Sequence, residues 1–193
     1  FFASNDSHEK SGNLDIGFRV LKIDTSNMED VYYSPERIST ADFFKDKKGV
    51  YVEFEMKTSN KKLNPDNSIP TYCEKAARAI KAKMPADAYW SMTSFDYRPL
   101  RYLRAHYPDI RLMLISGAPC NDQTITAARA LGVQGMAVTL GGTTREAMEK
   151  AHKEGLKVNL WPGKKVDDTR LALLLGADFC CTDIPIEVKT AFD

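Results

Sequence analysis

The unit that decides the fold spans residues 135–161 and reads GMAVTLGGTTREAMEKAHKEGLKVNLW. Apolar runs at 135–140 and 156–161 each predict a buried strand. The polar stretch between them opens on a threonine pair that can cap a helix, and this helix is expected to end at Gly155. A strand, a helix and a second strand joined by short loops form one crossover unit of a parallel sheet.

The same alternation continues on both sides of this unit. Further strands are predicted at 50–56, 88–93, 110–116 and 177–182, and further helices at 70–84, at 99–106, from Asn121 or Asp122 to Gly132, and from Asp167 or Asp168 to Gly176. Strict alternation of strands and helices favours parallel strands with right-handed crossovers.

The chain before residue 50 fits this pattern less well. Residues 18–24 read as one more strand, 31–33 as a short extended piece and 39–47 as a brief helix. Residues 1–4 are a doubtful further strand, because the polar segment 5–17 leaves no room for a normal crossover helix.

Seven clear strands and one doubtful strand approach the eight that close a (β/α)₈ barrel. The 193 residues give about 24 per unit, below the ~31 of a typical ~250-residue barrel. We therefore expect an α/β fold with a single domain over residues 1–193. This domain is a TIM-type barrel, shortened or incomplete at the N-terminus, with residues 1–49 as a divergent or truncated lead-in. An open doubly wound sheet is the alternative, although the sequence lacks the glycine-rich phosphate loop typical of that fold.

The composition is that of an ordinary globular protein, with 43% hydrophobic and 27% charged residues. Lys and Arg total 27 and Asp and Glu total 26, so charge gives no reason to expect nucleic acid or an anionic membrane as the partner. No apolar run approaches the ~18 residues of a membrane-spanning helix. No signal peptide is visible at the start, but an exported mature chain would have lost one, so a cytoplasmic and an exported location both stay open. The four cysteines lack metal-ligand spacing and are expected to be buried free thiols.

Charged side chains follow the strand predicted at 50–56. Side chains alternate between the two faces of a strand. The apolar face holds Val52, Phe54 and Met56, and the polar face holds Tyr51, Glu53, Glu55 and Lys57. If the apolar face packs against helices, Glu55 and Lys57 point into the barrel, where they can bind a hard cation and an anionic ligand respectively. The alternatives are an internal Glu–Lys ion pair or an edge strand with its charges in water.

Two further residues are candidates at strand ends, where barrel enzymes gather their functional groups. Asp24 ends the strand predicted at 18–24 and can share one Mg²⁺ or Ca²⁺ ion with Glu55. Equally, Asp24 can start a turn. Trp161 offers a flat wall to a small ligand, or packs in the core or at the rim.

Several segments appear in a recognisable order between the predicted strands and helices. They are Glu55-Met56-Lys57, Ser94-Phe95-Asp96-Tyr97-Arg98-Pro99-Leu100 followed by Leu103 and Pro108-Asp109-Ile110, Gly155-Leu156-Lys157-Val158-Asn159-Leu160-Trp161, and Gly176-Ala177-Asp178 leading to Thr182-Asp183-Ile184-Pro185. Together they resemble the glycerophosphodiester phosphodiesterases, which belong to the phospholipase-C-like phosphodiesterase TIM barrels. The resemblance covers residues 50–187, with a fainter similarity over 18–49.

This resemblance implies a (β/α)₈ barrel that hydrolyses glycerophosphodiesters to an alcohol and glycerol 3-phosphate in lipid metabolism. It implies a divalent cation, Mg²⁺ or Ca²⁺, held by carboxylates, and two histidines as general base and acid. Residue by residue, Glu55 matches the metal-binding Glu, Lys57 the phosphate-contacting Lys, and Trp161 the aromatic residue near the glycerol. Asp24 matches the second carboxylate of a Glu-x-Asp pair, whose first position is Lys22 here.

The chain departs from the family at both histidine positions, which hold 3–6 (ASND) and 32–35 (YYSP). No catalytic residue is therefore assigned. The histidines present, His8, His106 and His152, are expected to be surface or packing residues, with His8 the one candidate replacement. A general base and a general acid each contribute about 10² to 10⁴ in rate. The sequence after Trp161 also lacks the family's polar run, which puts glycerol recognition in doubt.

Three functional interpretations follow. The first is a metal-assisted phosphodiesterase with an altered acid/base set. The second is a non-catalytic barrel, or pseudoenzyme, that binds a phosphorylated polyol or serves as a protein-interaction domain. The third is a piece of a longer protein whose first crossover is missing. In the first two, the expected partner is a small phosphodiester or glycerol phosphate.

Overall fold

The computed structural model describes residues 3–4, 17–23, 31–33, 38–39, 51–84 and 88–192. The chain forms two compact units. One consists of residues 1–51 and 71–89, and the other of residues 52–70 and 90–193. The predicted single domain over the whole chain stays a prediction.

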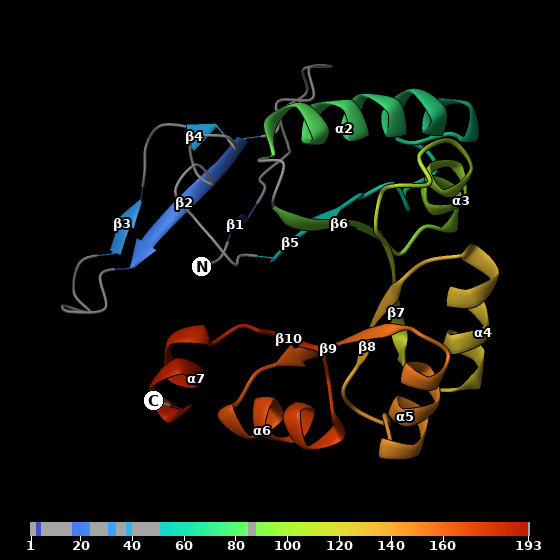
Figure 1. Ribbon diagram of the computed structural model, residues 1–193. Helices are drawn as coiled ribbons and strands as arrows, with labels where there is room; N and C mark the ends of the chain where they lie inside the picture. Colours follow the sequence, from blue (N-terminus) through green and yellow to red (C-terminus); the bar gives the residue numbers. More distant parts are fainter. Residues whose placement is uncertain are drawn as a thin grey trace. The chain divides into compact units, whose positions relative to one another are not determined.

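The second unit is built on a six-stranded sheet. Two of its strands begin with a residue that is assigned to the first unit, Tyr51 and Tyr89. Its strands are β5 (Tyr51–Glu55), β6 (Tyr89–Ser94), β7 (Leu112–Pro119), β8 (Gly135–Thr139), β9 (Lys157–Gly163) and β10 (Phe179–Thr182). Their spatial order is the chain order, and the pairs from β6 to β10 are parallel. The predicted α/β alternation is confirmed in this part of the chain (Figure 1).

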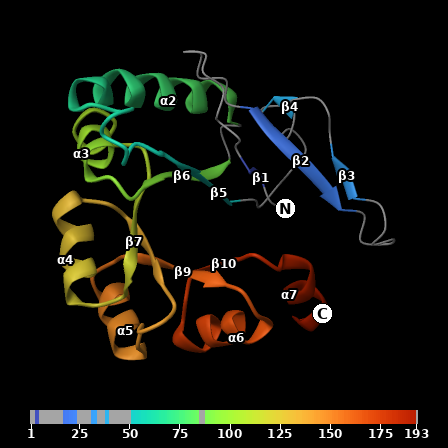
Figure 2. The same ribbon diagram turned by 180° about the vertical axis from the view of Figure 1, so that it is seen from behind.

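Helices connect these strands. They are α3 (Tyr97–His106), α4 (Asp122–Leu131), α5 (Arg145–Lys153) and α6 (Val166–Leu175), and α7 (Pro185–Phe192) follows β10. Between β5 and β6 lie a short 3₁₀ turn (Asp66–Ser68) and α2 (Ile69–Lys83), most of which belongs to the first unit. Seen from behind, α3 to α6 follow one another along the chain (Figure 2). Helix α7 was not predicted from the sequence.

Local signals set the helix ends. The Asn121 side chain caps α4 by accepting the backbone N–H of Thr124, and Gly132 ends it in a left-handed conformation with φ of 65°. The start of α6 differs from the prediction, because its first flanking residue is Lys165 rather than Asp167 or Asp168. Asp168 instead lies in the first turn and reaches back to accept the Lys165 N–H at 3.0 Å.

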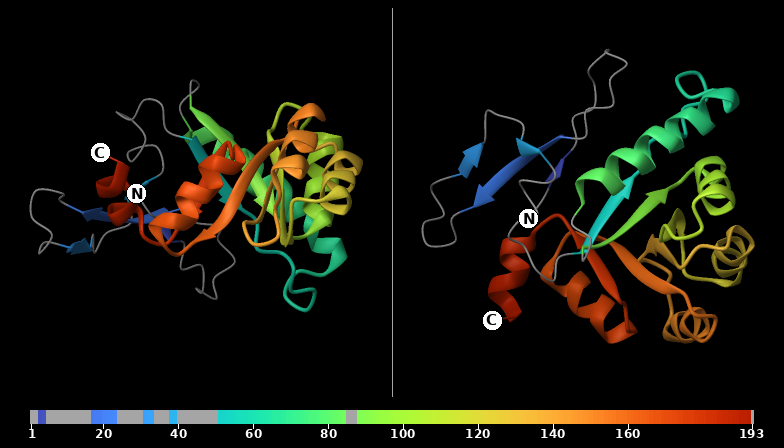
Figure 3. Two further views of the ribbon diagram at one scale, coloured as in Figure 1. Left: turned by 90° about the horizontal axis from the view of Figure 1, so that it is seen from below. Right: turned by 45° about the horizontal axis from the view of Figure 1, so that its top comes forward.

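The strands bury one face against the helices. The residues of this outer face include Met136 and Val138 on β8 and Val158 and Leu160 on β9, all fully buried. They pack in a core with helix residues such as Leu100, Leu103, Ala128, Met148 and Ala172. Each fully buried Val, Leu or Met side chain contributes about 1.5–3 kcal/mol relative to exposure. Figure 3 shows the strands side by side with helices along this outer face.

The opposite, inner face is concave. Its register places Ala137 beside Asn159 and Thr139 beside Trp161. Asn159 Nδ2 on β9 donates a hydrogen bond to Glu53 Oε1 on β5 at 3.1 Å. In a flat sheet these strands, four positions apart, would lie about 19 Å from each other. The side chains can meet only because the sheet curls, so the six strands form a half-barrel.

The strands near the start of the chain differ from the prediction. β2 (Gly17–Ile23) pairs antiparallel with β1 (Ala3–Ser4), β3 (Val31–Tyr33) and β4 (Ile38–Ser39). The strand expected at 18–24 therefore exists, but its expected parallel pairing is wrong. Only seven residues separate β2 from β3, whereas a parallel connection needs about a dozen or more. The helix predicted at 39–47 lies, beyond Ser39, outside the described residues.

Candidate functional site

The carboxyl end of β5 carries the two charged residues that the sequence analysis singled out. Lys57 Nζ lies 2.7 Å from Glu55 Oε2, and the side chains are 73% and 32% exposed respectively. An ion pair this open to water contributes about 0–1 kcal/mol to stability. Since so little free energy holds the pair together, a ligand can compete for either partner.

Trp161 lies on the same inner face, at the carboxyl end of β9. The ring of Phe95, which follows β6, meets it edge-on with centroids 6.0 Å apart and an interplanar angle of 87°. The indole Nε1 of Trp161 is buried and has no hydrogen-bond partner among the described residues. Trp161 is therefore half-buried within the half-barrel, and its polar edge is unsatisfied.

Cys181 on β10 also lies on this inner face, and it was not among the predicted site residues. The residue is exposed, so the expectation of a buried thiol is wrong here, whereas Cys73 and Cys120 are buried as expected. Partial burial of its sulfur raises the pKa of Cys181, and the carboxylates of Glu53, Asp183 and Glu55 raise it further. The acidic groups of β5 therefore lie near β10 across the half-barrel. Phe179 is the register partner of Asn159, and Cys181, two residues later, lies on the same face of β10. Strand alternation was therefore the signal that could have predicted the position of Cys181.

The backbone on both sides of Lys57 is anchored to the segment after β6. Ser94 Oγ donates to the carbonyl of Met56 at 2.8 Å, and Thr58 Oγ1 donates to Asp96 Oδ2 at 3.0 Å. Ser94 and Asp96 belong to the segment that carries the family resemblance. Their contacts fix the direction in which the chain leaves β5, and this places Lys57 beside Glu55.

Arg98 completes this anchor. Its guanidinium donates to both Asp96 oxygens, to the Thr58 carbonyl at 2.9 Å, to the Asn64 carbonyl at 3.1 Å and to Asp66 Oδ1 at 2.5 Å. Burial by itself raises the pKa of Asp96, but hydrogen bonds from Arg98 and Thr58 outweigh burial and hold that pKa below its usual value. The loop that follows Lys57 is thus tied down by charge-assisted bonds.

Of the two carboxylates predicted to bind the metal ion, only Glu55 is among the described residues. Asp24 lies outside the described residues. Among the residues that are described, no three His, Cys, Asp or Glu side chains converge to hold a metal ion. Glu55 supplies one partly exposed carboxylate, a donor that suits Mg²⁺ or Ca²⁺, and its role as a ligand stays a prediction.

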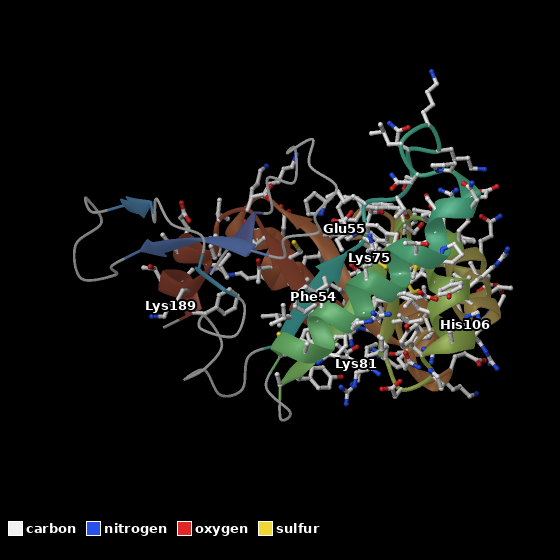
Figure 4. The ribbon with its side chains drawn as sticks, turned by 90° about the horizontal axis from the view of Figure 1, so that it is seen from above. Phe54, Glu55, Lys75, Lys81, His106 and Lys189 are labelled. Atoms are coloured by element: carbon white, nitrogen blue, oxygen red, sulfur yellow. The ribbon has the colours of Figure 1, made fainter. Side chains whose placement is uncertain are left out.

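Two of the three histidines lie away from this edge. His106 ends α3, where its Nδ1 is 2.9 Å from the Tyr102 carbonyl and its ring stacks on Tyr102. His152 lies in the last turn of α5, with Nε2 2.9 Å from Asp178 Oδ2. Helices that follow the strands end at the amino edge of the sheet, opposite Glu55. Figure 4 shows Glu55 and His106 well apart. His8 lies outside the described residues.

Comparison with known proteins identifies the fold. No family model matches the chain, and no curated protein does. Solved structures do match. A phosphodiesterase from Oleispira antarctica, in complex with the product sn-glycerol-3-phosphate, is 17% identical with a TM-score of 0.60, covering 66% of this chain and 51% of that one. A proposed glycerophosphodiester phosphodiesterase from Galdieria sulphuraria is 19% identical with a TM-score of 0.65, covering 79% and 61%.

A third structure, a glycerophosphodiester phosphodiesterase from Parabacteroides distasonis, is 14% identical with a TM-score of 0.56, covering 73% of this chain and 56% of that one. The chain thus spans between half and about three-fifths of the length of these structures. Across the helices in the described ranges, none is both long and apolar enough to span a bilayer. At these identities the similarity concerns the fold: the chain has a glycerophosphodiester phosphodiesterase-like α/β fold with a six-stranded parallel half-barrel.

Proposed function

We propose that this chain binds glycerophosphodiester head groups at the carboxyl edge of its sheet, assisted by a divalent cation. The observation that carries the proposal is the Glu55–Lys57 pair, whose charged atoms lie 2.7 Å apart and open to solvent at the end of β5. A carboxylate and an ammonium at one edge match the two needs of a cation-bound phosphodiester. The glycerol phosphate held by the Oleispira antarctica phosphodiesterase, a protein of similar fold, supports this choice of ligand.

Each site residue has a proposed role. Lys57 contacts a phosphate oxygen as a flexible point charge. Trp161 offers its ring to the carbon chain of the glycerol unit. Glu55 and Asp24 are the proposed ligands of Mg²⁺ or Ca²⁺, which prefer carboxylate oxygens. Once bound, the ion would neutralise phosphate charge. We further propose that the half-barrel is part of a shortened (β/α)₈ barrel.

Binding without turnover is the second candidate function. It is favoured by the residues at the family's two histidine positions, 3–6 (ASND) and 32–35 (YYSP), none of which is an imidazole. The contacts of His106 with Tyr102 and of His152 with Asp178 give each of these rings a packing role. Metal-assisted hydrolysis then relies on electrostatic stabilisation alone, unless His8 or water serves as the acid and base.

A binding assay tests the shared part of both candidates. We expect glycerol 3-phosphate with Mg²⁺ or Ca²⁺ to raise the melting temperature of the chain, and Lys57→Ala to diminish this rise. Lys153→Ala is the matched control, because Lys153 is an exposed lysine near the end of α5. If glycerol 3-phosphate and cation leave the melting temperature unchanged, the proposed function is wrong.

An activity assay separates the two candidates. The purified chain is incubated with glycerophosphocholine and Mg²⁺ or Ca²⁺, and the release of glycerol 3-phosphate is compared with that from the metal-only blank. Product above the blank that disappears in Glu55→Gln supports hydrolysis. Ligand binding with no product above the blank supports a non-catalytic barrel.

A further inference from the structure

The loop between β5 and the 3₁₀ turn carries the most exposed large hydrophobic side chain in the described part of the chain. This side chain is Leu63, which is 77% exposed. It directly follows Lys61 and Lys62, which are exposed as well. A single exposed leucine is ordinary on a protein surface, so the surroundings of Leu63 decide whether it has a role.

Hydrogen bonds hold residues 60–64 in a defined turn, called the docking turn below. The Asn60 carbonyl accepts the backbone N–H groups of Leu63 at 3.1 Å and of Asn64 at 2.8 Å. The Asn60 side chain also accepts the backbone N–H of Lys62 at 3.1 Å. Arg98 donates to the Asn64 carbonyl at 3.1 Å and so ties the end of the turn to the start of α3. Because the turn is already ordered, a partner that buries Leu63 has little loop entropy to offset.

The docking turn carries a local excess of positive charge. Between positions 57 and 68 the sequence has three lysines and one acidic residue, Asp66. Lys57 and Asp66 each form an ion pair within the fold, whereas Lys61 and Lys62 extend from the turn into solvent. Attraction to a charged surface acts within about 8 Å at physiological salt. It therefore depends on these two lysines more than on the net charge of the whole chain, which is only +1.

Two aromatic rings are exposed at the same edge of the sheet. Phe95, which follows β6, is 43% exposed, and Tyr97, the first residue of α3, is 41% exposed. They flank Asp96, which accepts a hydrogen bond from Thr58 at 3.0 Å, so this segment and the loop meet at the carboxyl edge. An apolar tip beside lysines and aromatic rings suits the surface of a bilayer, where ammonium groups meet anionic head groups and apolar side chains enter the acyl boundary.

We propose that the docking turn binds the carboxyl edge of the sheet to an anionic lipid surface. Leu63 enters the head-group layer, and Lys61 and Lys62 contact anionic head groups. This inference goes beyond the proposed function and does not rest on it, because docking needs neither a cation nor turnover. Lys57 stands three positions before Asn60, so docking also brings the proposed phosphate site close to lipid head groups.

Co-sedimentation of the full chain with lipid vesicles tests the proposal, in EDTA so that no divalent cation links protein and lipid. We expect the chain to bind vesicles of phosphatidylcholine mixed with phosphatidylserine, and to bind pure phosphatidylcholine much more weakly. Lys61→Gln and Lys62→Gln should each weaken binding about fivefold, the contribution of one lysine near an anionic surface. Leu63→Ala should weaken it about tenfold, because it removes most of the apolar surface that the lipid buries.

Two matched controls lie near the ends of helices at the opposite edge of the sheet. Leu174→Ala removes a leucine that is 66% exposed in the last turn of α6, and Lys153→Gln removes an exposed lysine at the end of α5. Both should bind the vesicles like the wild-type chain. If either control weakens binding as much as Leu63→Ala does, or if phosphatidylserine makes no difference, the proposal is wrong.

A tryptophan in the turn reports its position directly. The chain has two tryptophans, Trp90 and Trp161, and the emission that Leu63→Trp adds to theirs should be quenched by vesicles with brominated acyl chains. The emission that Leu174→Trp adds should not be quenched. Quenching of Leu174→Trp without quenching of Leu63→Trp would place the lipid at α6 and overturn the proposal.

The binding of glycerol 3-phosphate separates this proposal from the proposed function. Leu63→Ala should leave the rise in melting temperature with glycerol 3-phosphate and cation unchanged, because Leu63 is not a residue of the phosphate site. A chain that binds glycerol 3-phosphate but not the mixed vesicles overturns the docking turn and keeps the phosphate site. A chain that binds the vesicles through Leu63 but not glycerol 3-phosphate supports the docking turn and overturns the proposed function.

Discussion

Two lysine–carboxylate pairs lie at opposite edges of the parallel sheet, and their charged atoms have the same separation of 2.7 Å. Glu55 and Lys57 form one pair at the carboxyl edge, and Asp178 and Lys157 form the other at the amino edge. The Glu55 side chain is 32% exposed, whereas that of Asp178 is 16% exposed. Distance alone therefore does not separate a candidate ligand site from a structural contact.

The surroundings of the carboxylate make the difference. Asp178 also accepts the backbone N–H of Val158 at 2.9 Å and lies 2.9 Å from His152 Nε2. Burial raises the pKa of Asp178, but these bonds and that from Lys157 outweigh burial, so its pKa is lowered. A carboxylate with three partners, one of them a backbone N–H, is built into the fold. The Glu55 pair is open to solvent, so a ligand can compete for its charged groups.

The largest predicted effect comes from removing the satisfied carboxylate. Asp178→Ala removes the acceptor of the Val158 N–H and one acceptor of the Lys157 ammonium, so we expect a loss of about 3 kcal/mol in the free energy of unfolding. Urea denaturation measures it. Asp167→Ala is the control, because it removes only an exposed pair with Arg170 and should cost less than about 1 kcal/mol. Equal effects of the two variants would contradict the comparison.

The anchor at the carboxyl edge should give the next largest effect. Asp96→Ala removes the N-cap of α3 and the acceptor for Arg98 and Thr58, so we expect a loss of about 2 kcal/mol in the free energy of unfolding. Weaker binding of glycerol 3-phosphate should accompany it, because Lys57 loses its support. Asp66→Ala, which removes only the exposed partner of Arg98, should be close to neutral. If a folded Asp96→Ala chain binds glycerol 3-phosphate with unchanged affinity, the anchor does not position Lys57 for the ligand.

Much of this fold could be predicted from the sequence because its signals are local. Apolar runs placed β5 to β10, and Asn121 with Gly132 placed α4. The pairing of β2 could not be read from its own residues, because an isolated strand pattern does not say which strand it will join. Connection length was the available signal, since seven residues are too few for a parallel crossover.

The site divides in the same way. Glu55, Lys57 and Trp161 were candidates because each stands at a predicted strand end, and their place on one inner face follows from strand alternation. The bond from Asn159 to Glu53 joins residues 106 positions apart. This hydrogen bond depends on the curvature of the sheet, and no local sequence signal in either strand predicts it. The exposure of Cys181 belongs to the same class, because it is set by what lies across the half-barrel.

Acid should weaken the amino edge by a smaller amount, because protonation weakens the bonds of Asp178 without removing its side chain. Its folded pKa is lowered, so the folded state binds fewer protons than the unfolded state. The stability it contributes is present above its unfolded pKa of about 3.9 and is lost as the pH falls through the folded pKa. We expect the urea midpoint to fall below about pH 4, and to fall less steeply in Asp178→Asn. An identical pH profile in this variant would contradict the assignment.

The smallest effect on stability, and the sharpest contrast, should come from the two lysines. Lys57→Ala should change the free energy of unfolding by less than about 1 kcal/mol, because an exposed pair contributes little, while it weakens the binding of glycerol 3-phosphate. Lys157→Ala should lower the free energy of unfolding by more and leave ligand binding unchanged, because it takes a donor from the partly buried Asp178 and lies at the far edge from the proposed ligand. Urea unfolding and ligand affinity are both measured on each variant, so that the effects on stability and on binding can be compared. If Lys157→Ala weakens the binding of glycerol 3-phosphate as much as Lys57→Ala does, the two edges are not functionally distinct. The Glu55–Lys57 pair is then not a specific phosphate site.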